Sequence, residues 1–229
     1  MVTPPGRLST SVRSGGAQIV PRPDRWAPGP PPPWASGASA GLDEFLSAVS
    51  VRERPMLPAF PDARPAAVLV ALADGADGPS VLLTRRSWEL RHHRGEISFP
   101  GGRMDPGETP LDTALREADE EVGLDPRSVR IHGELEHLNT VVSRSYIVPK
   151  VGALTERVDL VGRTMEVDRV IWVPLAELTR PDTYRSEVWG TGATARVLHF
   201  FHLDDETIWG ATGRMLYDLL EKTLAPDPT

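Results

Sequence analysis

Three glutamates stand at spacings that a helix would bring onto one surface. Glu117, Glu120 and Glu121 are three and four residues apart, and such positions are neighbours on a helix. Like charges at these spacings repel by roughly a few tenths of a kcal/mol per pair. A Mg²⁺ ion prefers oxygen ligands and usually bridges one or two carboxylates to substrate phosphates. The residues therefore predict a divalent-metal site for a phosphate-bearing substrate. The alternative is a solvated acidic helix face with Arg116 as a local partner.

The residues around these glutamates predict the helix that carries them. Thr109 is suited to the N-cap, Pro110 to the first helical position, and Asp112 completes a capping pattern. Gly123 fits the residue after the last turn. Apolar residues recur at helical spacing on the other side, so one stripe faces a core. This stripe comprises Leu111, Ala114, Leu115, Ala118 and Val122.

The loop before this helix contains two consecutive glycines. Residues 99–102 read Phe-Pro-Gly-Gly and end a short apolar run. Glycine permits positive φ and lets the backbone approach a ligand or a metal closely. The loop is therefore suited to a close approach of its backbone to a ligand or a metal.

Residues 102–124 fit the pattern G-x5-E-x7-R-E-U-x-E-E-x-G-U, where U is apolar, at every specified position. In this the chain resembles the Nudix hydrolases. The resemblance implies an α/β (α+β) fold with a mixed β-sheet sandwiched between helices. It also implies metal-dependent hydrolysis of a nucleoside diphosphate linked to another moiety.

The resemblance further assigns roles to single residues. It implies that Mg²⁺ or Mn²⁺ is held by Glu117 and Glu121, with Glu120 as a third or water-mediated ligand. The backbone carbonyl of Gly102 is expected to join the metal shell, and Arg116 to orient the glutamates by ion pairing. The general base is either one of these glutamates or Glu166. The predicted catalytic residues are Glu117, Glu120, Glu121 and Arg116.

A second pattern lies directly upstream, at residues 82–102. It reads L-L-T-x-R-S-x3-R-x3-G-x3-F-P-G-G and resembles the coenzyme A pyrophosphatase branch of the same family. Four arginines and one glutamate stand between Arg85 and Arg94, whereas the whole chain has a net charge of −7. Arginine binds phosphate through a planar fork of donors, and coenzyme A carries three phosphates on two sites. The predicted substrate-binding residues are Arg86, Ser87, Arg91, Phe99 and Gly101.

This second resemblance implies that coenzyme A or a derivative is split into 3′,5′-ADP and 4′-phosphopantetheine. Residues 135–149 depart from the form expected in coenzyme A hydrolases, and they are expected to lie near the substrate. Three alternatives stay open. The chain could prefer ADP-ribose or a dinucleotide, it could sense a nucleotide without catalysis, or it could work through a proline-rich tail.

Composition limits the other classes of function. The chain has 229 residues, 40% of them hydrophobic, enough for one domain with a real core. It has no cysteine, which excludes disulfides and thiolate metal sites. No apolar run reaches the length of a membrane span, and no secretion signal is expected. We therefore expect a cytoplasmic protein with a small-molecule nucleotide substrate and neither nucleic-acid nor membrane partners. A homodimer stays open.

Three regions are predicted along the chain. Residues 1–40 are rich in Pro, Gly and Ser and are predicted to be a disordered tail, and residues 41–65 a short helix and a linker. Residues 66–225 are predicted to form the Nudix hydrolase domain. Within it, strands are expected at residues 66–72, 81–84, 96–99, 130–138, 146–154, 167–173, 197–203 and 208–209, and a second helix at 212–224. Trp209 is interpreted as a core residue.

Overall fold

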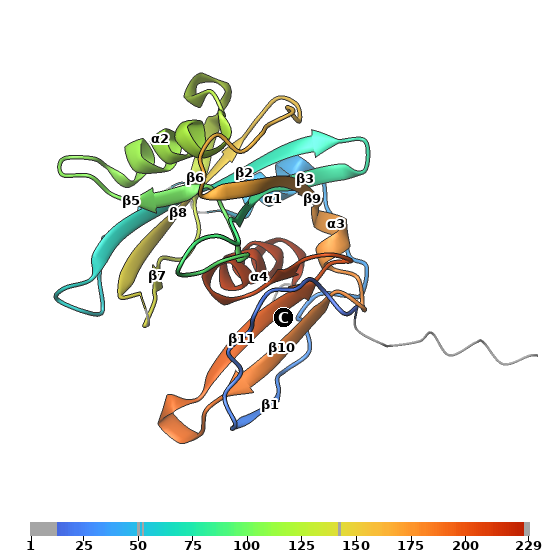
Figure 1. Ribbon diagram of the computed structural model, residues 1–229. Coiled ribbons are helices and arrows are strands. Elements are labelled where there is room, and N and C mark those ends of the chain that lie inside the picture. Colours follow the sequence, from blue (N-terminus) through green and yellow to red (C-terminus); the bar gives the residue numbers. More distant parts are fainter. Residues whose placement is uncertain (1–12, 50, 52, 142, 227–229) are drawn as a thin grey trace, which may run out of the picture.

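The structure is a computed structural model that describes residues 13–49, 51, 53–141 and 143–226. A large mixed sheet lies at the centre, with helices on both faces (Figure 1). The described helices are α1 (Leu42–Ser47), α2 (Pro110–Val122), α3 (Leu175–Leu178) and α4 (Gly210–Leu224), with short 3₁₀ turns at Pro126–Ser128 and Gly192–Thr194. No described helix is long and apolar enough to cross a bilayer.

The large sheet has eight strands in the described part of the chain. They are β2 (Arg64–Gly75), β3 (Gly78–Arg86), β4 (Ile97–Ser98), β5 (Gly101–Arg103), β6 (Arg130–Glu134), β7 (Leu138–Asn139), β8 (Ser145–Ala153) and β9 (Val167–Pro174). The order is β4-β3-β2-β8-β6, with β9 on β3, β5 on β2 and β7 on β8. The β2–β8 pair is parallel and the other pairs are antiparallel, so the sheet is mixed as predicted.

Alternation along β2 divides the core between the two faces of this sheet. Leu69 packs on one face with the apolar stripe of α2, including Ala114 and Ala118. Val70 packs on the other face with α4, including Leu216. Successive strand side chains point to opposite faces, so a fully apolar strand needs a cover on each side. The predicted arrangement of a sheet between helices is confirmed.

A second sheet, of four antiparallel strands, lies beside α4 (Figure 1). Its order is β1 (Trp26–Pro28), β10 (Tyr184–Trp189), β11 (Arg196–His202) and β12 (Thr207–Ile208). The sequence predicted β11 and β12 but not β10 or β1. Tyr184 of β10 pairs with Phe201 of β11, and Trp26 pairs with Trp189. The β1–β10 pairing joins segments far apart in the sequence, which local patterns do not reveal, whereas β10 and β11 form a hairpin connected by residues 190–195.

The prediction of a disordered tail is wrong for residues 13–40. Trp34 is 4% exposed and packs edge-on against Tyr184, with 5.1 Å between the ring centroids. The amide of Gly29 donates to the carbonyl of Ser186, next to the β1–β10 pair. The composition of the segment predicted disorder because it does not show that one residue, Trp34, can be buried as an aromatic anchor. The prolines also reduce the conformational entropy that the segment loses when it packs on the domain. Residues 1–12, the rest of the predicted tail, lie outside the described residues.

Candidate functional site

Two of the predicted metal ligands lie over the two consecutive glycines. The amide of Gly101 donates to Oε2 of Glu121 at 3.2 Å. A Cβ atom on Gly102 would lie only 2.4 Å from Oε1 of Glu117. A Cβ on Gly101 would lie 2.5 Å from the carbonyl oxygen of Ala67 in β2. Gly101 therefore requires glycine so that β5 can pair with β2, whereas a side chain at position 102 would push the Glu117 carboxylate out of its place.

Helix α2 presents these glutamates because its start and end are fixed locally. The hydroxyl of Thr109 accepts from the amide of Asp112 at 3.2 Å, and the amide of Thr109 donates to the Asp112 carboxylate at 2.9 Å. Gly123 ends the helix in the left-handed conformation, with φ of 75°. The predicted cap, first residue and end of the helix are all confirmed.

Arg116 lies at the centre of an acidic network on the same face. Its Nε donates to Glu108 at 2.7 Å, and its Nη1 donates to Glu117 at 2.9 Å and to Glu120 at 3.2 Å. Glu108 also accepts from the hydroxyl of Thr113 at 2.6 Å. The hydrogen bond from Arg116 is the largest cause that lowers the pKa of Glu108, to about 2. One guanidinium thus joins three of the pattern's glutamates, as an orienting role requires.

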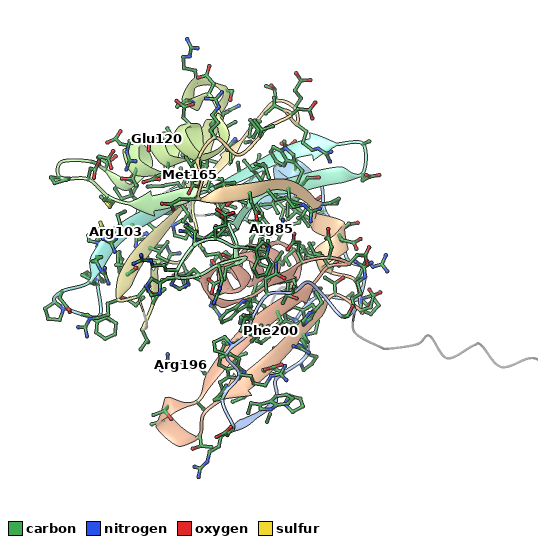
Figure 2. All side chains as sticks on the ribbon, in the orientation of Figure 1. Arg85, Arg103, Glu120, Met165, Arg196 and Phe200 are labelled. Atoms are coloured by element: carbon green, nitrogen blue, oxygen red, sulfur yellow. The ribbon has the colours of Figure 1, made fainter. Side chains whose placement is uncertain are left out.

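Glu120 differs from the other two glutamates in its surroundings. Its side chain is largely exposed, and its one recorded partner in the described chain is Arg116. Figure 2 shows it on the outer side of α2. Glu121, in contrast, is 8% exposed. The sequence spacing predicted that all three glutamates lie on one helix. The fold makes Glu117 and Glu121 an inner pair and leaves Glu120 exposed on the outside.

Burial gives the inner pair unusual electrostatics. Burial is the largest cause that raises the pKa of Glu121 to about 7, and the neighbouring Glu117 and Glu166 raise it further, while the Gly101 amide and Arg86 oppose this. Burial also raises the pKa of Glu117. Two carboxylates held this close to one another in a partly desolvated place need positive charge nearby.

A divalent cation fits this donor set. In the described part of the chain, no three acidic or histidine side chains form a ready metal cage. Mg²⁺ does not need one, because it usually binds one or two carboxylates and keeps its other positions for water and substrate phosphates. Glu117 and Glu121, with the backbone of Gly102 beneath them, supply hard oxygen donors of this kind.

The upstream pattern brings one arginine to the same place. Arg86, the last residue of β3, donates from Nη2 to Glu166 at 3.0 Å, and the amide of Ser87 donates to the Glu166 carbonyl at 2.7 Å. The charge of Arg86 also acts on Glu121. Among the described residues, the buried Nε of Arg86 has no hydrogen-bond partner. A cation with a free donor therefore stands beside the inner carboxylates, as a diphosphate site requires.

The other predicted substrate residues lie elsewhere around the loop of residues 87–95. Arg91 is exposed on that loop. The Ser87 hydroxyl accepts from the amide of Glu89 at 3.2 Å, so it closes a turn. Phe99 is buried in the core on the α4 side of the sheet. The structure thus gives Ser87 a position that supports the loop, places Phe99 in the core where it also lines a pocket, and leaves Arg91 exposed to solvent or ligand.

The N-terminal segment holds this loop in place, which the sequence did not reveal. Nε2 of Gln18 donates to the carbonyl of Gly95 at 3.0 Å and also to the buried carboxylate of Glu206. Oε1 of Gln18 accepts from the amide of Thr207 at 2.8 Å. One buried amide therefore ties the end of the arginine-bearing loop to β12 of the second sheet.

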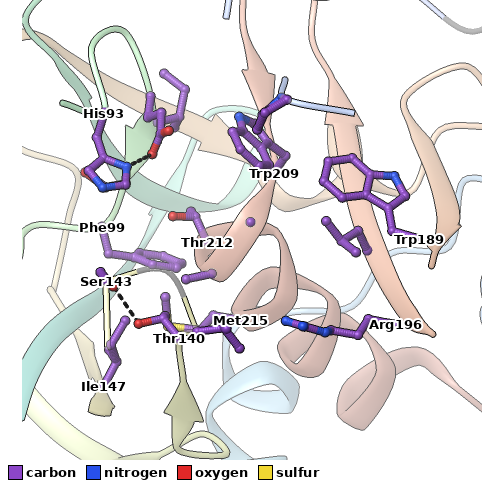
Figure 3. A pocket seen from close by; sticks show the side chains of 18 of the residues that line it. His93, Phe99, Thr140, Ser143, Ile147, Trp189, Arg196, Trp209, Thr212 and Met215 are labelled. Carbon is purple, nitrogen blue, oxygen red and sulfur yellow. Dashed lines mark hydrogen bonds and ion pairs between the residues drawn. The ribbon is translucent and has the colours of Figure 1, made fainter. Parts of the chain in front are cut away.

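A pocket of about 740 Å³ opens between the two sheets (Figure 3). Its walls come from β2, the segment around β4, residues 140–147, the β10–β11 hairpin and the start of α4. Trp209, interpreted from the sequence as a core residue, lines it together with Trp189. Sequence reasoning missed the pocket because its walls belong to segments far apart in the chain. The unusual loop at 135–149 was the one local signal, and Thr140 and Ile147 from it line the pocket.

Comparison with known proteins gives the same assignment as the residues. The profile of the NUDIX domain matches residues 63–189. The chain is 46% identical over 144 residues to Nudix hydrolase 3 of Caenorhabditis elegans, covering 59% of this chain and 58% of that protein. It is 30% identical over 190 residues to a Yersinia enterocolitica protein named "Uncharacterized Nudix hydrolase NudL", covering 82% of this chain and 96% of that one.

Similarity to solved structures is weaker. A crystal structure of a C. elegans Ap4A hydrolase complex aligns with a TM-score of 0.43 and 25% identity, over 48% of this chain and 80% of that one. The assignment depends instead on the domain match, which spans the capped helix, the double glycine and the glutamates described above. The chain belongs to the Nudix family and is a Nudix hydrolase.

Proposed function

We propose that this Nudix hydrolase splits coenzyme A or its derivatives into 3′,5′-ADP and 4′-phosphopantetheine. Nudix hydrolases act on nucleoside diphosphates linked to another moiety. The observation that carries the finer assignment is the position of Arg86. It belongs to the upstream pattern of residues 82–102, and it lies beside Glu121 with a buried, unpartnered Nε among the described residues.

The metal ligands in this proposal are Glu117, Glu121 and the carbonyl of Gly102, with Glu120 as an outer or water-mediated ligand. Mg²⁺ or Mn²⁺ bound there would neutralise charge on the diphosphate and lower the pKa of bound water. Two contacts support this set of ligands: the Glu117 carboxylate lies directly over Gly102, and the amide of Gly101 donates a hydrogen bond to Glu121.

The remaining residues have positioning and binding roles. Arg116 holds Glu117 in place through a 2.9 Å ion pair. A second ion pair, with Glu108, fixes the position of the Arg116 side chain itself. Arg86, whose side chain is partly exposed, binds a diphosphate oxygen through its guanidinium group. Glu166 is held by Arg86 at 3.0 Å and is one candidate to take a proton from the attacking water; a glutamate of the pattern at residues 102–124 is the other. The reaction adds water to one phosphorus and breaks the bridging P–O bond.

A panel of diphosphates tests this proposal directly. Coenzyme A, dephospho-coenzyme A, ADP-ribose, NADH and a dinucleoside polyphosphate are incubated at equal concentration with Mg²⁺ or Mn²⁺, and products are identified by mass spectrometry. Fastest turnover of coenzyme A to 3′,5′-ADP and 4′-phosphopantetheine is expected. A clear preference for ADP-ribose or a dinucleotide would replace the substrate but keep the reaction. No turnover of any member would favour a nucleotide-sensing role.

A further inference from the structure

The 740 Å³ pocket lies on the α4 face of the large sheet, and a continuous piece of chain links it to the glutamates of α2, the helix that covers the other face. Ser98 and Phe99 line the pocket, and Gly101, which bonds to Glu121, follows two residues later. Val68 also lines the pocket and is the register partner of Gly101 in the β2–β5 pair. A substrate whose phosphates lie at Glu117 and Glu121 can therefore extend into this pocket around the edge of β5.

The lining is mainly aliphatic and aromatic, and most of its polar groups already have partners. Figure 3 shows Phe99, Ile147 and Met215 around one space. The hydroxyls of Thr140 and Ser143 bond each other at 2.6 Å. Nδ1 of His93 and the carboxylate of Glu96 are 2.9 Å apart. Such walls favour an apolar ligand over one with many hydrogen-bonding edges.

The two tryptophans form a wedge instead of a stacking slot. Trp189 and Trp209 have ring centroids 6.4 Å apart and planes inclined at 39°. Aromatic rings at this separation already contact each other, so a flat base does not fit between them. The indole of Trp189 donates to Glu187 at 2.7 Å, whereas the buried Nε1 of Trp209 has no partner among the described residues. Because this Nε1 atom has almost no exposed surface, the tryptophans present mainly their apolar ring faces and edges to the pocket.

We infer that this pocket binds the pantetheine arm of the substrate and an acyl chain on its sulfur. This rests on the proposed coenzyme A hydrolysis and specifies which end of that substrate enters the pocket. The arm is a flexible chain of methylene and methyl groups with two amides, and its apolar parts match the aliphatic and aromatic walls. The acyl chain fills the remaining apolar volume. Acyl thioesters are then better substrates than free coenzyme A.

A chain-length series tests this inference with a matched pair of variants. Leu198 lines the pocket, and its neighbour Val197 is exposed on the opposite face of β11, because strand side chains alternate. We expect kcat/KM of the wild type to rise by at least about tenfold from coenzyme A to decanoyl-coenzyme A, since each buried methylene favours binding. Leu198→Phe should flatten this dependence to within about threefold, and Val197→Phe should preserve it. A flat wild-type series, or equal effects of both variants, would overturn the inference.

A binding measurement separates the pocket from the reaction. S-octanoylpantetheine has no diphosphate and is titrated into wild type, Trp209→Phe and Leu198→Phe, with intrinsic fluorescence and calorimetry as readouts. Saturable binding, weakened by both variants, supports the pocket even if coenzyme A proves not to be cleaved. Cleavage of coenzyme A without any binding of S-octanoylpantetheine overturns the pocket alone.

Adenosine 3′,5′-bisphosphate provides the opposing test. Arg196 is exposed at the start of β11 and lines the same pocket, so a nucleotide entering here would meet its charge. We expect Leu198→Phe and Arg196→Ala to leave adenosine 3′,5′-bisphosphate binding within about twofold of wild type. Selective loss of that binding in these variants would show that the pocket holds the nucleotide, and the inference would be wrong.

Discussion

At the scale of single residues, position in the fold distinguishes glutamates that the sequence pattern treats alike. Glu121 is nearly buried and bonds the Gly101 amide, Glu117 lies over Gly102, and Glu120 reaches outward to Arg116. The two inner residues combine desolvation with mutual repulsion, which a bound cation or a proton relieves. The consequences of replacing them should therefore be unequal.

Glu121→Gln should reduce kcat at saturating Mg²⁺ by at least about 10²-fold. The amide keeps an acceptor for the Gly101 N–H, so the fold is preserved, but it removes the charge that a cation needs. Asp119→Asn is the control, since this exposed residue of α2 reaches Arg163 only at 3.5 Å. Circular dichroism and thermal unfolding check the fold. Activity of Glu121→Gln within tenfold of wild type would contradict the metal role.

Arg91→Ala should raise KM for coenzyme A more than it lowers kcat. Arg91 is exposed on the loop beyond Arg86, so a contact with the 3′-phosphate would be remote from the reacting phosphorus and equal in ground and transition states. Loss of such a charge-assisted contact weakens binding by roughly 1.5–3 kcal/mol. Dephospho-coenzyme A, which lacks the 3′-phosphate, should show a much smaller change. Equal losses on both substrates would assign Arg91 to the diphosphate or to the loop itself.

At the scale of elements, the N-terminal segment of residues 13–40 acts as part of the domain. It adds β1 to the second sheet, places Trp34 in the core and ties the 87–95 loop through Gln18. Arg22 of the same segment makes an ion pair with the buried Glu187 of β10. The segment therefore couples the stability of the second sheet to the order of the substrate loop.

Trp34→Ala should lower the free energy of unfolding by about 3–5 kcal/mol, the usual cost of truncating a large buried aromatic residue. Trp26→Ala on the same segment is the matched control. Trp26 is 44% exposed and contacts the guanidinium of Arg22, so its loss should cost less than about 1 kcal/mol. Urea unfolding measures both. Similar costs for the two variants would show that the segment does not dock through Trp34.

At the scale of the whole molecule, two buried histidines link stability to pH. Burial lowers the pKa of His199 and of His202, in each case to about 4. The hydroxyl of Tyr184 and Nδ1 of His199 are 2.9 Å apart, and Nε2 of each histidine is buried without a partner in the described chain. Both histidines belong to β11 of the second sheet, and their rings are buried against the elements that pack on that sheet. Protonating either ring places an uncompensated charge in the core.

The free energy of unfolding should therefore fall as the pH drops from about 7 to 4. Unfolded histidines titrate near pH ~6.5, so between that value and the folded pKa the unfolded chain binds more protons. The loss is on the order of 3 kcal/mol per histidine at the lower end. Urea unfolding at pH 6.5, 5.5 and 4.5 measures this slope. The double variant His199→Gln, His202→Gln should have a shallower slope, and His92→Gln, on the exposed loop, should not. Equal slopes in all three proteins would contradict the assignment.

The sequence by itself determined the helix that carries the glutamates. Thr109, Asp112 and Gly123 specify the ends of α2 through hydrogen bonds within a few residues, so neighbours in the chain suffice. Likewise, the apolar alternation of β2 indicated a strand covered on both faces. The family and the reaction class could be predicted for the same reason, because the catalytic pattern occupies one continuous stretch.

Only the tertiary structure decided which residues meet across the fold. Arg86 and Glu121 are separated by most of the catalytic pattern and come together because β3 and β5 both pair with β2. The addition of β1 to β10 and the docking of Trp34 on Tyr184 depend on partners more than a hundred residues apart. The pocket beside Trp209 is assembled from several separate segments. Such contacts arise from the shared burial of distant surfaces, and no local spacing encodes them.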